Sequence, residues 1–402
     1  MKLLWINAGF LHPTTRGGQI RTLGMLRRLH LRHEVHYMGL RTPGDEEGVR
    51  RSSEYCSHVY PVDFQALDKT SWKFTGQLAS GLVDPVPLTV VRYRSEEMRR
   101  ALGQLLEKER FDRVVCDFLA SSINVPRMPE AVLFQHNVET MIWRRRVEHA
   151  RNWAELAYLK LQARRMFAYE ARICREAADV IAVSEVDAQM MQDMFGLAHV
   201  GHVPTGVDLE YFERPREAGE GSGDLIFLGS MDWAPNVDGV LYFVREILPR
   251  IRRQRPDTTL TIVGREPPPE IRVLASEPGI VVTGTVPDVR PYLWGAKVSI
   301  VPLRIGGGTR LKIFEAMAAG VATVSTRIGA EGIPADHPTT IRLADEPDAF
   351  AAECLDLLQN AAVRASLVDA AGALVREHFS WESVTRQFEA LLGEAAGHAA
   401  QS

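Results

Sequence analysis

The sequence predicts an α/β protein built from two doubly wound domains. Short apolar strand-like runs alternate with helical stretches of about 10–20 residues along the whole chain, the pattern of parallel sheets with helices on both faces. The length of 402 residues supports two domains, because one domain commonly takes roughly 100–200 residues. A single continuous sheet is disfavoured, since open sheets rarely run past about ten strands.

The expected strands form two series. Those of the first series are Lys2–Asn7, Glu34–Met38, Arg113–Cys116, Ala131–Phe134, Val180–Val183 and His199–Val203. Those of the second are Leu225–Leu228, Thr259–Val263, Ile280–Thr283, Val298–Val301 and Ala322–Ser325. A stretch rich in Pro, Gly, Glu and Ser, residues 213–223, separates them and is typical of a linker. We expect an N-terminal domain over residues 1–205, a C-terminal domain over 206–379, and a final helix over 380–402 that crosses back to the N-terminal domain.

Composition excludes several classes of protein. Hydrophobic residues make up 46% of the chain, which excludes a wholly disordered protein. The 47 basic and 51 acidic residues give a net charge of −4, which argues against a nucleic-acid partner. That total is the sum of a net charge of +4 over residues 1–205 and of −8 over residues 206–402.

The lack of a membrane-spanning run, of a signal-peptide cleavage site and of closely spaced cysteines predicts a cytoplasmic protein. The chain has no run of 18 apolar residues, so we expect no membrane-spanning helix. The N-terminus is interpreted as a first strand because it lacks the cleavage site of a signal peptide. The four cysteines are at least 58 residues apart, which argues against zinc pairs, redox pairs and a disulfide scaffold.

The strongest candidate site is a glycine-rich turn over residues 302–312. It follows the strand Val298–Val301 and opens a helix, and it contains Gly306, Gly307, Gly308 and Thr309. Glycines let backbone N–H groups approach an anion, and a helix N-terminus attracts negative charge. Arg310 and Lys312 add two full positive charges, so the turn suits a diphosphate. A flexible turn with two exposed cations is the alternative.

Other candidate residues also follow strands, where parallel sheets bind ligands. They are Gly17-Gly18 after the first strand, His136 after Ala131–Phe134, and Gly229-Ser230 after Leu225–Leu228. Each has a structural alternative: the glycines would form turns and His136 would be a hydrogen-bonding residue. Glu315, three residues after Lys312, either pairs with that lysine or accepts hydrogen bonds from a ribose diol.

Missing motifs narrow the chemistry. The first loop lacks G-x-G-x-x-G, so a nicotinamide or flavin cofactor is disfavoured. No D-x-D, H-E-x-x-H or G-x-S-x-G motif and no His/Cys cluster occurs, so we expect neither a bound metal nor a resident cofactor.

A basic helical stretch, Met141–Ala177, carries nine Arg or Lys residues against four Glu. A solvated helix with i,i+4 ion pairs is one interpretation. The other is contact with an anionic membrane surface that brings a lipid-linked acceptor, which would place the protein peripherally at the inner membrane face.

Together these motifs resemble the retaining GT-B glycosyltransferases, the large bacterial group of mannosyl- and glucosyltransferases in lipid and polysaccharide synthesis. The resemblance covers nearly the whole chain. It rests on Gly17-Gly18, His136, Gly229-Ser230, and the segment from Gly306–Gly308 to Glu315-Ala316-Met317-Ala318-Ala319-Gly320. It implies two Rossmann-like domains that face each other across a cleft.

The resemblance also implies a role for each site residue. The backbone of Gly307, Gly308 and Thr309 would hold the diphosphate, and Arg310 or Lys312 would balance its charge. Glu315 would bind the ribose and groups near Val286 the base. His136 would touch the transferred sugar, and Gly17-Gly18 would bracket donor and acceptor.

The sequence departs from the family pattern in several places, among them Thr205, where the family usually has Asn. Gly307 stands where the family usually has a second Glu. The usual cation pair after the first strand of the second domain is replaced by Gly229-Ser230 and Pro235-Asn236, so charge compensation shifts to Arg310 and Lys312.

The expected reaction is metal-independent transfer of a hexose, with retention, from a UDP- or GDP-sugar to the hydroxyl of a sugar or lipid-linked acceptor. The nucleotide-sugar is then a substrate and no cofactor is needed. Two alternatives stay open: a nucleotide-sugar epimerase of the same fold, and a non-catalytic sugar-nucleotide binding protein.

Overall fold

The computed structural model describes residues 1–14, 17–65, 84–148, 150, 152–215, 222–305, 311–334 and 337–399, with the backbone alone for 394–399. The chain divides into two compact units, which are described separately. Unit 1 comprises Met1–Pro204 and Val384–Ser402, and unit 2 comprises Thr205–Ser383. Residues 216–221 of the predicted linker lie outside the described part of the chain.

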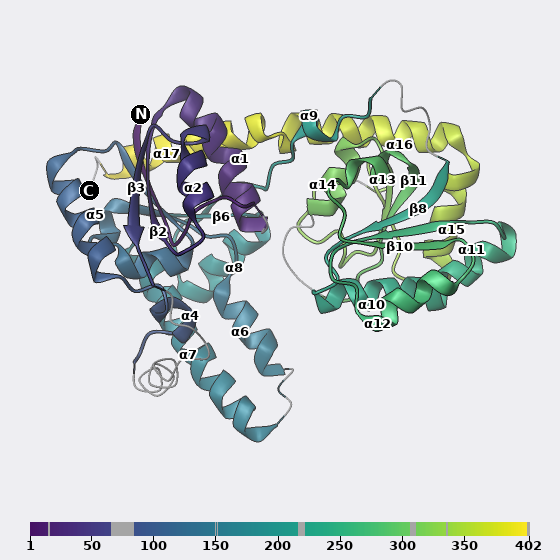
Figure 1. Ribbon diagram of the computed structural model, residues 1–402, viewed down its shortest axis with the longest axis horizontal. Helices are drawn as coiled ribbons and strands as arrows, with labels where there is room; N and C mark the ends of the chain where they lie inside the picture. The colour runs from purple at the N-terminus through teal and green to yellow at the C-terminus, as the bar shows by residue number, and fades with distance from the viewer. Residues whose placement is uncertain are drawn as a thin grey trace. The chain divides into compact units, whose positions relative to one another are not determined.

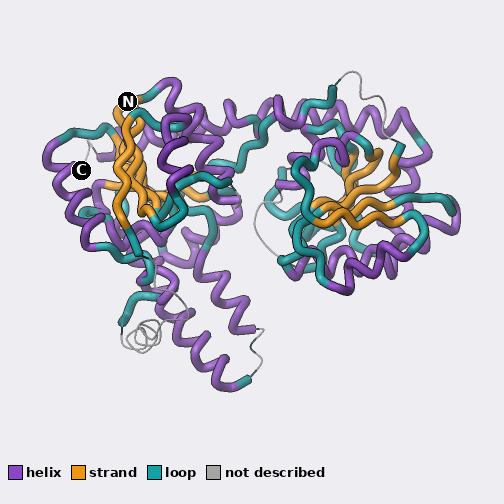
Figure 2. The backbone as a smooth tube through the Cα atoms, in the orientation of Figure 1, coloured by secondary structure: helices purple, strands orange, loops and turns teal. Residues whose placement is uncertain are grey.

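Unit 1 contains a parallel sheet whose seven described strands run in the order β3-β2-β1-β4-β5-β6-β7. They are β1 (Lys2–Asn7), β2 (Glu34–Arg41), β3 (His58–Asp63), β4 (Arg113–Asp117), β5 (Ala131–Phe134), β6 (Asp179–Ala182) and β7 (Gly201–His202). Helices cover both faces of this sheet (Figures 1 and 2). The strand order reverses between β1 and β4, and ligands of such sheets bind beyond the carboxyl ends of the strands at that reversal.

The helices of unit 1 include α1, α5 and the antiparallel pair α6 and α7, which projects beyond the sheet in Figure 1. The α-helices are α1 (Gly17–Arg32), α2 (Glu46–Arg50), α4 (Leu88–Val91), α5 (Glu96–Lys108), α6 (Glu139–Glu148), α7 (Trp153–Glu176), α8 (Glu185–Phe195) and, shared with unit 2, α17 (Trp381–Ala399). Short 3₁₀ helices are η1 (Arg51–Glu54), η2 (Leu119–Asn124) and η3 (Met128–Glu130).

Unit 2 contains a second parallel sheet with six described strands in the order β10-β9-β8-β11-β12-β13. They are β8 (Gly223–Leu228), β9 (Leu260–Val263), β10 (Ile280–Gly284), β11 (Ala296–Val301), β12 (Ala322–Ser325) and β13 (Arg342–Leu343). Here the order reverses between β8 and β11, which makes the ends of these strands the expected ligand site of this unit.

The helices of unit 2 again lie on both faces of the sheet (Figure 2). They are α9 (Leu209–Phe212), α10 (Ala234–Tyr242), α11 (Leu248–Gln254), α12 (Pro269–Arg272), α13 (Arg290–Trp294), α14 (Leu311–Ala318), α15 (Pro347–Gln359) and α16 (Ala361–Leu374). Two segments are π-helical, η5 (Phe243–Ile247) and η7 (Val375–Phe379), and η6 (Val273–Ser276) is a 3₁₀ turn.

Each unit has its own hydrophobic core. In unit 1 the buried Trp5 of β1 contacts Phe134 of β5 and Phe388 of α17, with ring centroids 6.2 and 5.7 Å away. The C-terminal helix therefore completes the core of the first unit. In unit 2, Phe314 of α14 stacks on Phe379 at 4.3 Å. None of the helices that the structure describes combines the length and hydrophobicity that crossing a bilayer requires.

The α/β class with two parallel sheets is confirmed, with three corrections. Strand β3 was not predicted, because Pro61 interrupts its pattern; as an edge strand, β3 tolerates a proline. Strand β13 has only two residues, too few to produce a pattern. The stretch Met141–Ala177 is two helices, since Asn152 caps α7 by accepting a hydrogen bond from the backbone N–H of Glu155 at 2.9 Å.

Candidate functional site

A buried carboxylate, Asp117, organises the reversal point of the unit 1 sheet. It ends β4 and has no exposed surface. Its Oδ2 accepts hydrogen bonds from Trp5 Nε1 at 3.0 Å, Asn7 Nδ2 at 2.7 Å and Thr22 Oγ1 at 2.8 Å. Its Oδ1 lies 2.6 Å from Nε2 of His136. These four bonds tie the ends of β1, β4 and β5 to helix α1.

His136 has a hydrogen-bond partner on each ring nitrogen. The Asp117 carboxylate accepts from Nε2–H, which leaves Nδ1 to accept from Arg21 Nη1 at 3.0 Å. Burial lowers the pKa of His136 despite the opposing effect of Asp117, so the neutral ring is favoured. Burial also lowers the pKa of Arg21, to about 10. Both nitrogens of His136 are therefore engaged within the protein.

Phe118 covers the other side of His136. The two rings stack with centroids 3.7 Å apart and an interplanar angle of 13°. Phe118 adopts φ +66°, which is uncommon for a residue with a side chain. A Cβ at Gly18 would lie only 2.4 Å from the Phe118 ring, so this position requires glycine. Gly17, in the same first turn of α1, has open space around it.

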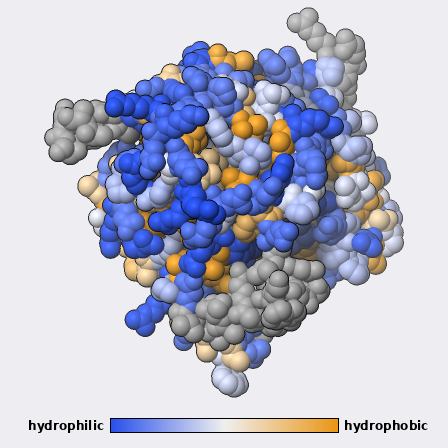
Figure 3. All heavy atoms as spheres, turned by 60° about the vertical axis from the view of Figure 1, so that its left-hand side comes forward, coloured by the Kyte–Doolittle hydropathy of each residue, from blue (hydrophilic) through white to orange (hydrophobic). Residues whose placement is uncertain are grey.

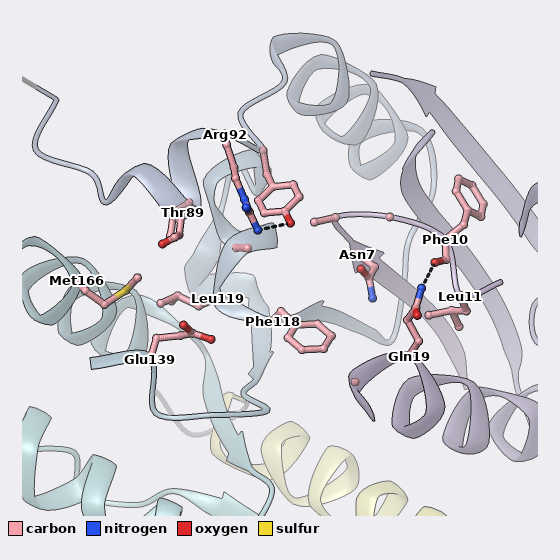
Figure 4. Close-up of a pocket in the computed structure, with 16 residues that line it drawn as sticks. Asn7, Phe10, Leu11, Gln19, Thr89, Arg92, Phe118, Leu119, Glu139 and Met166 are labelled. Carbon is pink, nitrogen blue, oxygen red and sulfur yellow. Dashed lines mark hydrogen bonds between the residues drawn. The ribbon is translucent and has the colours of Figure 1, made fainter. Parts of the chain in front are cut away.

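A cavity of about 360 Å³ opens beside Phe118 (Figure 4). The loop after β1, the start of α1, the α4 segment and the turn after β4 line it, with Glu139 and Met166. Thr89 Oγ1 is buried there and has no hydrogen-bond partner within the described residues. Arg92 donates to the Tyr93 hydroxyl at 2.7 Å. Hydroxyl, guanidinium, carboxylate and aromatic groups in one cavity suit a polyhydroxylated ligand.

Glu170 of α7 is a second buried carboxylate near this cavity, which the sequence reasoning did not single out. It accepts hydrogen bonds from Gln135 Nε2 and from the backbone N–H of Glu139, both at 2.9 Å. It also accepts from Thr140 N at 2.7 Å and Thr140 Oγ1 at 2.6 Å. Burial raises the pKa of Glu170 to about 7. Glu170 therefore holds the N-terminus of α6, and with it Glu139, at the cavity wall.

In unit 2, Lys312 of α14 reaches the end of β8. Its Nζ donates to Asn236 Oδ1 at 2.8 Å, and Asn236 Nδ2 donates to the Ser230 carbonyl at 2.7 Å. The same Nζ lies 4.4 Å from the centre of the Phe227 ring. A Cβ at Gly229 would approach Lys312 Nζ to 2.7 Å, so glycine makes room for the amine. The structure brings together Gly229, Ser230 and Lys312 as predicted site residues.

Arg265 supplies a further cation at this edge, which the sequence reasoning missed. It follows β9, the neighbour of β8 in the sheet. Its Nε donates to Ser230 Oγ at 2.7 Å and its Nη2 to Asp232 Oδ2 at 3.0 Å. The signal that could have found it is its place one residue after Gly264 at a strand end.

Glu315 lies one turn of α14 beyond Lys312 and is half-buried. Burial raises the pKa of its carboxyl to about 7, and Lys312 opposes that shift. Within the described residues it accepts no hydrogen bond. Its charge acts on Tyr211, whose hydroxyl lies 3.5 Å from Asp288 Oδ1.

Val286 lies on the turn after β10 and is half-buried against the core of unit 2. The remaining predicted residues, Gly307, Gly308, Thr309 and Arg310, lie outside the described part of the chain, as does Gly306.

Two family models match the chain, one in each half. Residues 15–211 match the model described as Glycosyltransferase Family 4, and residues 222–360 match the model described as Glycosyl transferases group 1. An uncharacterized 44.6 kDa protein in the cps region of Klebsiella pneumoniae is 20% identical over 400 residues, which are 95% of this chain and 97% of that protein.

Solved structures match over nearly the full length. Sucrose-phosphate synthase from Thermosynechococcus elongatus superposes with a TM-score of 0.69 and 17% identity, covering 98% of each chain. HepE from Anabaena, in complex with UDP-glucose, superposes with a TM-score of 0.62 and 15% identity, covering 98% of this chain and 100% of that one. At these identities the superpositions establish the shared fold.

Proposed function

This chain belongs to the GT-B glycosyltransferases, and we propose that it transfers a hexose from a UDP- or GDP-sugar to an acceptor hydroxyl with retention at the anomeric carbon. Exopolysaccharide or glycolipid synthesis is the proposed setting. The complex of HepE with UDP-glucose supports this donor class, and the relative in a cps region supports the setting.

The observation that carries the proposal is the fixed amine of Lys312. Asn236 holds it beside Gly229, at the strand reversal of unit 2 and one helical turn from Glu315. An amine held in place can stabilise the negative charge that develops on the leaving diphosphate. Glu315 accepts no hydrogen bond from the described residues. Its carboxylate is therefore suited to accept hydrogen bonds from the ribose diol.

In the proposed reaction the bond between the anomeric carbon and the phosphate oxygen breaks, and its electron pair goes to the diphosphate. The acceptor oxygen bonds to the same face of the anomeric carbon, and its proton passes to the departing phosphate oxygen. Lys312, with Arg310 and Arg265, would take the charge-compensating role that other enzymes give to a metal ion, so activity should survive chelation.

The cavity beside Phe118 is the proposed acceptor site in unit 1. Its Thr89 hydroxyl, which has no partner among the described residues, offers polar contacts around apolar walls together with Arg92 and Glu139. A direct contact between His136 and the transferred sugar would require Arg21 to release Nδ1. We therefore assign His136 to holding Phe118 and Arg21 in position at this cavity.

A lipid-linked acceptor is compatible with the helix pair α6 and α7. Trp153, at the start of α7, is 83% exposed, and Arg144, Arg145 and Arg146 at the end of α6 are exposed too. These arginines are the groups that would attract anionic headgroups, and the face drawn in Figure 3 is mostly hydrophilic, with hydrophobic residues interspersed. Flotation with vesicles that contain or lack anionic lipid tests this contact; equal flotation with both would exclude it.

A screen of nucleotide-sugars by thermal shift and donor turnover tests the central proposal. One UDP- or GDP-hexose should raise the melting temperature, and product NMR should show the donor's anomeric configuration. Lys312→Met should lower turnover about 10²–10³-fold. Epimerised donor without acceptor would indicate an epimerase, and tight binding without turnover would indicate a binding protein. No response to any donor would overturn the proposal.

A further inference from the structure

Three side chains with metal-binding atoms lie together at the amino-terminal ends of β2 and β3. Asp117 and His136 lie at the carboxyl ends of β4 and β5. All strands of this sheet are parallel, so those two residues lie at the opposite end of the strands. His36 pairs with His58 in the β2–β3 register. Glu34 precedes His36 by two residues, so the two share a face.

The distances within this cluster are close to those of a metal centre. Oε1 of Glu34 accepts a hydrogen bond from Nε2 of His36 at 2.8 Å, whose proton a metal ion would replace, and it lies 3.6 Å from Nε2 of His58. The three ligand atoms all lie within 4.8 Å of one another. Ligands of a tetrahedral zinc ion, bonded at about 2.0–2.1 Å, are roughly 3.3 Å apart. Small side-chain rotations would therefore bring all three onto one ion.

The surroundings of His36 fix its orientation. Its Nδ1 lies 2.8 Å from the Tyr60 hydroxyl, and its ring makes a T-shaped contact with the ring of Phe111, with centroids 5.0 Å apart. Only 2% of the residue is exposed. A partner on Nδ1 is the usual way in which proteins aim the Nε2 of a histidine at a metal. Glu34 and His58, with 47% and 55% of their side chains exposed, leave the site open to solvent.

One positive charge opposes cation binding. The Lys2 amine lies 3.7 Å from Oε1 of Glu34. The same amine lies 2.6 Å from Oε2 of Glu109, which compensates its charge. Lys2 therefore weakens the site without blocking it.

We propose that Glu34, His36 and His58 bind one divalent transition-metal ion of the Zn²⁺ type. Two imidazoles and one carboxylate suit zinc and its neighbours, whereas Mg²⁺ and Ca²⁺ prefer oxygen ligands. Three protein ligands leave the fourth position to water. The bound ion would join β3, the edge strand of the sheet, to β2.

Metal titration of the full-length protein tests the proposal. The chain should carry no histidine tag and should first be stripped with a chelator. Zn²⁺ or Co²⁺ alone should bind at one ion per chain and raise the melting temperature, and bound Co²⁺ should show the visible absorption of a low-symmetry site. Mg²⁺ and Ca²⁺ should not compete. A wild-type protein that binds neither Zn²⁺ nor Co²⁺ would overturn the proposal.

Variants locate the site. His58→Ala, at an exposed position, should abolish binding of the single ion, whereas His202→Ala, at an exposed histidine of β7, should leave it unchanged. Tyr60→Phe should weaken affinity about 10–100-fold, and Lys2→Met should strengthen it. Unchanged binding by His58→Ala would place the ion elsewhere and refute this assignment.

Discussion

Glu170 of unit 1 and Glu315 of unit 2 share a pKa raised to about 7 by burial, yet the structure uses them differently. Glu170 accepts four hydrogen bonds from Gln135, Glu139 and Thr140. Glu315 accepts none from the described residues, and the attraction of Lys312 opposes its shift.

The difference separates a carboxylate that supports the fold from one that is available to a ligand. A raised pKa marks both kinds of site equally. Hydrogen bonding distinguishes them, because the acceptor positions of Glu170 are used within the protein. Replacing each carboxylate should therefore change stability in opposite directions.

The largest expected effect is that of Glu170→Ala. The change leaves buried donors of Gln135, Glu139 and Thr140 without their acceptor. Unpaired buried donors cost about 1–3 kcal/mol each, and breaking a buried charged network commonly costs about 3–5 kcal/mol in total. We expect a loss of that size in the free energy of unfolding, measured by urea denaturation.

Glu176→Ala is the matched control on the same helix. Glu176 is exposed and makes an i,i+4 ion pair with Arg172 at 3.2 Å. Such a pair contributes about 0.5 kcal/mol. Equal losses for the two variants would show that the four hydrogen bonds of Glu170 contribute nothing to stability.

The sequence was sufficient for the fold class because strand and helix periodicities are local properties. It was insufficient for β3, where Pro61 hides an edge strand, and for the break between α6 and α7. The Asn152 and Glu155 spacing at that break is a helix-start signal. The basic residues on both sides of the break form a continuous pattern, which masks this signal.

The site residues were harder to predict because their contacts are long-range. Asp117 follows an apolar strand just as His136 does, but its bonds to Trp5 and Asn7 span 112 and 110 positions. Glu170 has the same side chain as the exposed Glu176. Its buried neighbours Met166 and Cys174, four residues away on each side, were the available signal.

Glu315→Gln should have the opposite effect on stability. The folded-state pKa of about 7 exceeds the ordinary 4.5, so the folded chain retains a proton that the unfolded chain releases between these values. Stability therefore falls as pH rises through this window. The loss in the free energy of unfolding is complete above pH 7, where it reaches about 3 kcal/mol. The variant should be more stable than wild type at pH 8, by up to that amount, and the gain should shrink toward pH 5.

Donor binding by Glu315→Gln should weaken about tenfold at pH 8, because a carboxylate accepts stronger hydrogen bonds than an amide. Isothermal titration with the nucleotide-sugar found in the screen measures this loss, with Glu331→Gln at an exposed position of unit 2 as the control. A variant less stable than wild type at pH 8 would assign Glu315 to the fold, like Glu170.

The smallest expected effect, that of Arg265→Ala, extends the comparison from carboxylates to cations. Arg21 is buried against His136, whereas the Arg265 side chain is 46% exposed and pairs with Asp232. Its removal should change the free energy of unfolding by no more than about 0.5 kcal/mol. The donor KM should still rise about fivefold, since a cation near the diphosphate contributes about 1 kcal/mol at a solvated site.

Arg327→Ala, which removes another exposed ion pair of unit 2, should leave KM unchanged. If both arginine variants keep the wild-type KM, Arg265 does not balance the charge of the donor diphosphate. Among the described residues, that role would then fall to Lys312.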